Sequence, residues 1–166
     1  MSTDQSFRKA QEAAVRLLSY RPRSEAELRT RLNRRFPSGT VDQVVRSLKQ
    51  RSLVNDREFA MLWAESRNRQ KPRSAAAIRR ELVSKGVAPD TADSAASIVD
   101  DEESAIRAGT RFARRMVDAD FALFRRRLGG YLQRRGYSGG LTRRTVSRLW
   151  EEKPHGSARS TYADAE

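Results

Sequence analysis

A tripeptide recurs along this chain at a spacing of fifty residues. Pro-Arg-Ser occupies residues 22–24 and again residues 72–74, and leucines keep the same spacing at Leu32, Leu82 and Leu132. The spacing predicts three copies of one unit, of which the third is the least regular. Units of this length bury little apolar surface alone and pack mainly on their neighbours, so we expect a short array in place of one central core.

Apolar residues recur at helical spacing, and no stretch shows the sustained alternation that is typical of strands. We therefore predict an all-α protein whose nine helices group into three tandem three-helix repeats, forming an elongated curved array. The helices are expected at about residues 5–19, from Ser24, after Thr40, from Asn55, from Ser74, from Pro89, and at about residues 102–117, 120–135 and 142–151. The repeats are predicted at residues 5–50, 54–100 and 102–151, with a disordered tail at residues 152–166.

Two helix starts carry a capping pattern. Ser24 with Glu27, and Thr40 with Gln43, fit the capping box, in which each side chain satisfies a free amide of the other residue. We expect the second helix to begin after Ser24 and the third helix to begin after Thr40.

The apolar positions predict which residues are buried. At the fifty-residue offset Leu48 falls on Ile98, so both are expected in a core. Leu62 and Phe121 also stand at apolar helical positions and are expected to face the cores of their repeats.

Positive charge is concentrated in two blocks. The formal net charge of the chain is +13, with +10 in residues 21–86, −6 in residues 87–104 and +10 in residues 105–150. Basic blocks favour polyanions through phosphate contacts and counterion release, so we expect a nucleic acid or an acidic protein as partner.

Arginines without an internal partner are the candidate contacts, because the planar guanidinium binds two oxygens of a phosphate or carboxylate at once. One group lies at the end of the fourth helix, in the loop after it and on the fifth helix, and the other lies in the last repeat. The candidates are Arg67, Arg69, Lys71, Arg73, Arg79, Arg80, Arg125, Arg126, Arg127, Arg134, Arg135, Arg143 and Arg144. A solvated helix surface is the alternative interpretation for each of them.

The residues needed for catalysis or cofactor binding do not occur in a recognisable pattern. The chain has no cysteine, its single histidine is His155 in the tail, and no glycine-rich phosphate loop is present. The acidic run at residues 100–103 is interpreted as a helix start, where the helix dipole favours negative charge. We expect no enzymatic activity, no cofactor, no metal and no membrane association, and we expect a cytoplasmic location, because no apolar run reaches the length of a signal peptide.

Several short motifs resemble the RecX family in their order and spacing. They are Leu53-Val54-Asn55-Asp56, Phe59-Ala60, Lys85-Gly86-Val87 and Arg134-Arg135-Gly136-Tyr137. The similarity covers about residues 10–151. Two positions depart from the family pattern: Ser52 stands where glycine is usual, and Arg34-Arg35-Phe36 lacks the glycine found at residues 86 and 136.

The resemblance implies a tandem three-helix protein that binds the RecA filament along its helical groove. Members of the family dampen the ATPase, strand-exchange and coprotease activities of RecA, and they modulate recombination, DNA repair and the SOS response. The implied partners are the RecA recombinase filament and single-stranded DNA, with double-stranded DNA as a further candidate, and we expect a monomer. Two alternatives remain from the residues alone: a DNA-binding regulator of the helix-turn-helix kind, and a basic helical protein associated with RNA or the ribosome.

Overall fold

The computed structural model describes residues 3–153, and within them the chain forms nine α-helices and no strand. The helices are α1 (Thr3–Tyr20), α2 (Glu25–Leu32), α3 (Ser38–Gln50), α4 (Asp56–Gln70), α5 (Ala75–Ser84), α6 (Pro89–Ala96), α7 (Asp101–Ala113), α8 (Phe121–Arg134) and α9 (Gly139–Glu151). The all-α prediction is confirmed. Of the tail predicted at residues 152–166, only Glu152 and Lys153 are described, and the rest of it, with His155, lies outside the described residues.

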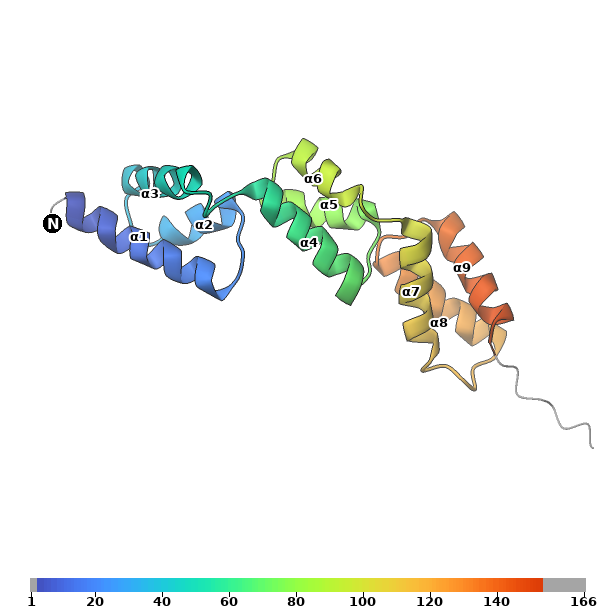
Figure 1. The fold of residues 1–166 in the computed structure, drawn as a ribbon. Helices are drawn as coiled ribbons and strands as arrows, with labels where there is room; N and C mark the ends of the chain where they lie inside the picture. Colours follow the sequence, from blue (N-terminus) through green and yellow to red (C-terminus); the bar gives the residue numbers. More distant parts are fainter. Residues whose placement is uncertain (1–2, 154–166) are drawn as a thin grey trace, which may run out of the picture.

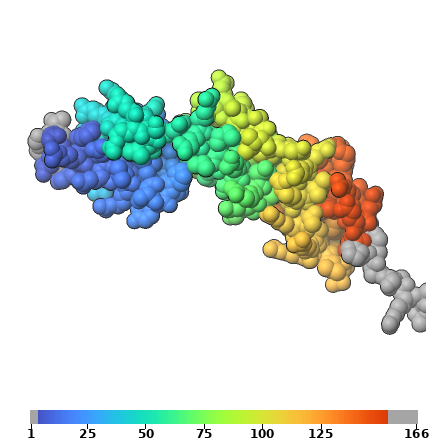
Figure 2. All heavy atoms as spheres, viewed as in Figure 1, coloured from blue at the N-terminus to red at the C-terminus, as the bar shows by residue number. Residues whose placement is uncertain are grey.

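Three separate clusters of buried residues divide the helices into groups of three. We call α1–α3 unit 1, α4–α6 unit 2 and α7–α9 unit 3. Leu32, Leu82 and Leu132 are fully or almost fully buried, one in each cluster. The units follow one another in an elongated, gently curved row (Figures 1 and 2). This is the predicted arrangement, while the repeat boundaries at residues 5–50, 54–100 and 102–151 stay predictions.

Serine and aspartate side chains define most helix starts. Ser24 accepts from the Glu27 amide and Glu27 accepts from the Ser24 amide, so the predicted capping box of α2 is confirmed. The box predicted at Thr40 is wrong, because α3 begins two residues earlier, at Ser38. There the Val41 amide already donates to the Pro37 carbonyl, which places Thr40 inside the first turn.

The predicted register fails at the third helix of unit 2. Ile98 is 40% exposed, whereas Leu48 is fully buried, so the predicted equivalence of the two residues is wrong. The physical reason is that α6 ends at Ala96, and the turn after it carries Val99 into the core in place of Ile98.

Two other apolar predictions are also wrong. Leu62 is 46% exposed because it lines an open groove between α1 and α4, at the junction of units 1 and 2. Phe121 is 42% exposed because it is the first residue of α8, where its ring packs against Trp150 in a tilted arrangement outside the buried cluster.

The Pro-Arg-Ser tripeptides connect each unit to the next. The Ser24 hydroxyl donates to the Lys85 carbonyl at 2.5 Å, and the Ser74 amide donates to the Arg135 carbonyl at 3.1 Å. In both cases the start of one unit's middle helix contacts the end of the next unit's middle helix. The two junctions are therefore built alike.

An aspartate completes each junction. Asp56 accepts from the Glu25 amide at 2.8 Å, and Asp101 accepts from the Ala75 amide at 2.7 Å. Both amides belong to the first turn of a helix and have no partner within that helix. The neighbouring unit thus caps the middle helix of the unit before it.

Glycine is required where the units approach most closely. Gly86 has φ +80° and Gly136 has φ +92°, and a side chain at either would collide with the preceding unit: Gly86 lies against Ala26, and Gly136 lies against Ser74 and Ala77. This explains why the first repeat lacks the glycine. The end of α2 meets no preceding unit among the described residues, so no close approach has to be accommodated there.

Candidate functional site

Glu81 on α5 holds two of the candidate arginines. Arg67 donates from Nε to Glu81 Oε2 at 2.8 Å, and Arg73 lies 3.0 Å from Glu81 Oε1. Trp63 donates from Nε1 to the same Glu81 Oε2 at 2.8 Å, and the Arg67 guanidinium lies 4.5 Å from the Trp63 ring. Both arginines are thus engaged inside unit 2, where Arg67 holds α4 on α5 and Arg73 holds the loop between these two helices on α5.

The remaining candidates of unit 2 divide into one paired residue and three free ones. Arg79 forms an ion pair with Asp93 of α6, and the hydrogen bond that Arg79 donates to that carboxylate raises the pKa of the Arg79 guanidinium. Within residues 3–153, no ion pair or hydrogen bond engages the side chains of Arg69, Lys71 or Arg80, and all three are exposed. These three cations are available to a partner.

Unit 3 shows the same division. Arg135 donates to the Pro72 carbonyl at 2.8 Å and lies 4.6 Å from the Tyr131 ring, so it belongs to the junction with unit 2. Arg144 forms a 3.0 Å ion pair with Glu102, although both side chains are about two-thirds exposed. An exposed pair of this kind stabilises the fold little and can exchange partners.

The other candidate arginines of unit 3 lie on the exposed surfaces of α8 and α9. The Arg125 guanidinium lies 5.8 Å from the Phe121 ring. Across the described part of the chain, no ion pair, hydrogen bond or ring contact engages the side chains of the four remaining candidates of this unit, which are Arg126, Arg127, Arg134 and Arg143.

The premise that all the candidates lack internal partners is therefore wrong for five of them. These are Arg67, Arg73, Arg79, Arg135 and Arg144. Their partners are carboxylates and a carbonyl on other helices or loops, between 8 and 63 residues away in the chain. Whether any candidate contacts a partner molecule stays a prediction.

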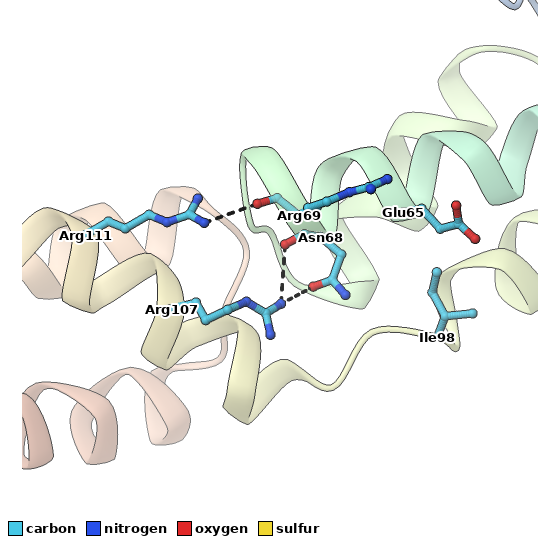
Figure 3. A pocket seen from close by; sticks show the side chains of 6 residues that line it. All are labelled: Glu65, Asn68, Arg69, Ile98, Arg107 and Arg111. Atoms are coloured by element: carbon cyan, nitrogen blue, oxygen red, sulfur yellow. Dashed lines mark hydrogen bonds between the residues drawn. The ribbon is translucent and has the colours of Figure 1, made fainter.

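Two arginines that the sequence did not single out join units 2 and 3. Arg107 of α7 donates to the carbonyl of Asn68 at 3.3 Å and also to the Asn68 side chain. Arg111 donates to the carbonyls of Arg69 and Gln70 at 3.3 and 3.2 Å. Figure 3 shows both side chains extending from α7 to the end of α4. Cations at this position stabilise a helix terminus because they bind its free carbonyls and oppose its dipole.

A cleft of about 480 Å³ opens beside these contacts (Figure 3). It is lined by Arg69, Arg107 and Arg111 together with Glu65, Asn68 and Ile98. The lining residues include no pairing of a nucleophile with a base. The signal that could have identified Arg107 and Arg111 is their i, i+4 spacing on one face of a helix.

Each acid of the run at residues 100–103 has its own partner. Asp100 accepts from the Glu103 amide at 3.0 Å, Glu102 pairs with Arg144, and Glu103 pairs with Arg107 at 2.9 Å. Asp101 caps the middle helix of unit 2, as described above. The carboxylates therefore serve as helix caps and ion pairs. Between residues 3 and 153, no three side chains of the metal-ligating kinds gather at one point.

Glu27 connects units 1 and 2 electrostatically. Its carboxylate lies 3.0 Å from the Arg21 guanidinium and 3.1 Å from Lys85 Nζ. Burial tends to raise the pKa of Glu27, but hydrogen bonds from Arg21, Lys85 and the Ser24 amide outweigh it and lower the pKa to about 2. Glu27 is therefore charged near neutral pH, and it holds Lys85 at the junction.

None of the helices within residues 3–153 combines the length and the apolar character that crossing a lipid bilayer requires.

Comparisons with known proteins agree with the tandem arrangement. Residues 10–48 match the family described as RecX, first three-helix domain, and residues 55–95 match RecX, second three-helix domain. The chain is 36% identical to the regulatory protein RecX of Amycolatopsis mediterranei, over 97% of this chain and 93% of that protein. It is 31% identical to the regulatory protein RecX of Chlorobium limicola, over 91% of this chain and 96% of that protein.

The fold is also found in solved structures. The crystal structure of RecX from Lactobacillus salivarius superposes with a TM-score of 0.74 and 18% identity, covering 89% of this chain and 99% of that one. A second crystal structure of a regulatory protein RecX superposes with a TM-score of 0.72 and 19% identity, covering 87% of this chain and 73% of that one. At these sequence identities the superpositions show only that the fold is the same.

Proposed function

The chain belongs to the RecX family, and from this premise we propose that it regulates a RecA recombinase by binding along the RecA–single-stranded DNA filament. By this proposal it inhibits the ATPase, strand-exchange and coprotease activities of RecA. It acts by binding alone, as a cytoplasmic monomer without a catalytic activity of its own. The observation that carries the proposal is identity to regulatory RecX proteins along nearly the whole array, and not in one unit only.

The shape of the molecule supports a long partner. Three units in a row present successive helices along one elongated body (Figure 1). A filament groove is itself long, and it offers acidic protein surface together with DNA phosphate. An extended array can contact such a groove at many points, whereas a small ligand would occupy only one of them.

The free cations are the proposed contacts. In unit 2 they are Arg69, Lys71 and Arg80, and in unit 3 they are Arg126, Arg127, Arg134 and Arg143. Each exposed ion pair is worth only about 0–1 kcal/mol. Several of them on one array add up, because the first contact raises the effective concentration of the others. The arginines held by Glu81 and by the junctions instead keep the array in shape.

The test reverses the three free cations of unit 2. We expect the full-length triple variant R69E/K71E/R80E to keep the helical circular dichroism and thermal midpoint of the wild type. The concentration needed for half-inhibition of the DNA-dependent ATPase of the cognate RecA should rise about tenfold or more, since three contacts become repulsions.

A matched control separates position from net charge. The variant R46E/R51E/R57E removes the same charge from exposed arginines outside the candidate set, and it should inhibit nearly as well as the wild type. Equal inhibition by both triple variants would show that the central cations are not the contact surface. If the wild type itself leaves the ATPase unchanged, the alternative of a DNA-binding regulator is the better interpretation.

A further inference from the structure

Unit 1 contains a basic groove, and none of the candidate residues lines it. The groove, of about 610 Å³, lies between α1 and the end of α2 with the turn that follows it. Five cations line it: Lys9 and Arg16 from α1, and Arg31, Arg34 and Arg35 from α2 and the turn. Glu12 is the one acidic residue in the lining.

These five cations are not neutralised by the protein. Among the described residues none of the five forms an ion pair, whereas Arg8, Arg21, Arg29 and Lys49 of the same unit each pair with a carboxylate. The charge of Arg31 is also felt by Arg23, whose pKa is lowered by burial and then by its basic neighbours. The acids of unit 1 other than Glu12 thus pair with other cations, and the five cations of the groove keep a surplus of positive charge over Glu12.

Aromatic side chains accompany the cations. Tyr20 is the last residue of α1 and lines the groove. Its side chain is 78% exposed, so it does not stabilise the core of unit 1. Phe36 is half-buried on the other side, with the Arg35 guanidinium 6.0 Å from its ring. Ala13 and Leu17 supply an apolar lining between them.

We propose that this groove binds single-stranded nucleic acid, with phosphates on Arg31, Arg34 and Arg16 and with a base stacked on Tyr20. Cations that follow a backbone, beside an aromatic ring for base stacking, are the combination by which proteins hold single strands without sequence preference. An acidic protein surface would use the cations but not the exposed ring. A duplex keeps its bases stacked internally and cannot offer one to Tyr20.

The inference rests on the proposed function in expecting a DNA partner, but its test requires no RecA. The fluorescence anisotropy of a labelled oligothymidylate of about 15 nucleotides is measured with full-length variants. We expect R31Q/R34Q to weaken binding about tenfold. The slope of the logarithm of the binding constant against the logarithm of the salt concentration should become shallower by about 1.4, because each phosphate contact on a single strand contributes about 0.7 to this slope.

Paired variants test the position and the ring separately. R46Q/R51Q removes the same charge from exposed arginines of unit 1 outside the groove, and it should change affinity less than twofold. Tyr20→Ala should weaken binding at least about fivefold, the lower limit for loss of a base stack, while Tyr20→Phe should bind like the wild type. Circular dichroism verifies that each variant is folded.

Two results would overturn the assignment. If R31Q/R34Q binds the oligonucleotide no more weakly than R46Q/R51Q, the groove is not the site. If Tyr20→Ala binds normally and polyglutamate competes as well as the oligonucleotide, the groove fits an acidic protein surface and not a nucleic acid. Loss of RecA inhibition in R69E/K71E/R80E with oligothymidylate binding intact would show that the two surfaces act independently.

Discussion

Within residues 3–153, three residues adopt a left-handed backbone conformation: Ser52, Gly86 and Gly136, with φ of 56°, 80° and 92°. Each follows the end of a helix and closes it with the same bond, in which the next amide reaches back five residues to a helix carbonyl. Glycine adopts this conformation at little steric cost, but serine does not. Ser52 therefore stores strain at the position where the RecX family pattern has glycine.

We expect Ser52→Gly to stabilise the protein by up to about 1 kcal/mol, because relief of the left-handed strain exceeds the added chain entropy of glycine in the unfolded state. The measurement is the urea midpoint. The neighbouring change Arg51→Gly is the control: Arg51 has φ −90°, so glycine relieves nothing there and should lower the midpoint. A lower midpoint for Ser52→Gly as well would contradict the strain argument.

At the scale of the helix, the fifty-residue repeat encodes the junctions between units. Pro-Arg-Ser precedes the middle helix of units 1 and 2, and each of these units is followed by another unit. Glycine follows the middle helix of units 2 and 3, and each of these units is preceded by another unit. Unit 3 begins its middle helix with Asp120, which accepts from the Leu123 amide within its own helix. Unit 1 thus lacks the glycine and unit 3 lacks Pro-Arg-Ser because each of them takes part in only one junction of the array.

The junction makes glycine indispensable at residue 136. We expect Gly136→Ala to destabilise the protein by about 2–4 kcal/mol. The alanine would have to keep the left-handed φ of residue 136, and its Cβ would lie 2.5 Å from Ser74 Oγ and 2.7 Å from Ala77 Cβ.

Gly39→Ala is the matched control for that change. It adds the same methyl group in the first turn of α3, where nothing lies within 4 Å. It should be neutral or stabilise the protein by about 0.4–1 kcal/mol. Urea denaturation compares the two variants, and equal effects would mean that the units do not meet as closely at Gly136 as the structure indicates.

At the scale of the whole molecule, three small cores in a row replace one central core. The buried clusters contain residues 10–54, 59–99 and 105–149 and share no member. In such an array stability is approximately a sum over units and their junctions. A defect in an end unit is therefore expected to unfold that unit first and to leave the others folded.

Leu28→Ala tests this expectation. Leu28 is fully buried in unit 1, so the change should cost that unit about 2–5 kcal/mol. Both tryptophans lie outside unit 1, Trp63 in unit 2 and Trp150 in unit 3. Far-ultraviolet circular dichroism should therefore begin to fall at lower urea than tryptophan fluorescence changes. If the two signals change at the same urea concentration, the three units unfold as a single cooperative body. Leu62→Ala is the control: because Leu62 is 46% exposed, this change should not separate the two transitions more than in the wild type.

The helices, most of their caps, the threefold repeat and the family could all be predicted from the amino-acid sequence. These features depend on residues within a few positions of one another or on a spacing along the chain. The Ser24–Glu27 box forms over three residues, and the buried series Leu32, Leu82 and Leu132 follows from the period alone. Helical periodicity and capping are local, so they can be read before the chain is folded.

Which cations are free depends on contacts between residues that are far apart in the sequence. Glu81 neutralises Arg67 from 14 residues away, and Pro72 accepts from Arg135 across 63 residues. The surplus charge beside Tyr20 likewise appears only when α1 and the end of α2 lie together. The free energy of an ion pair depends on distance and solvent exposure, and both are set by the packing of helices that are far apart in the sequence.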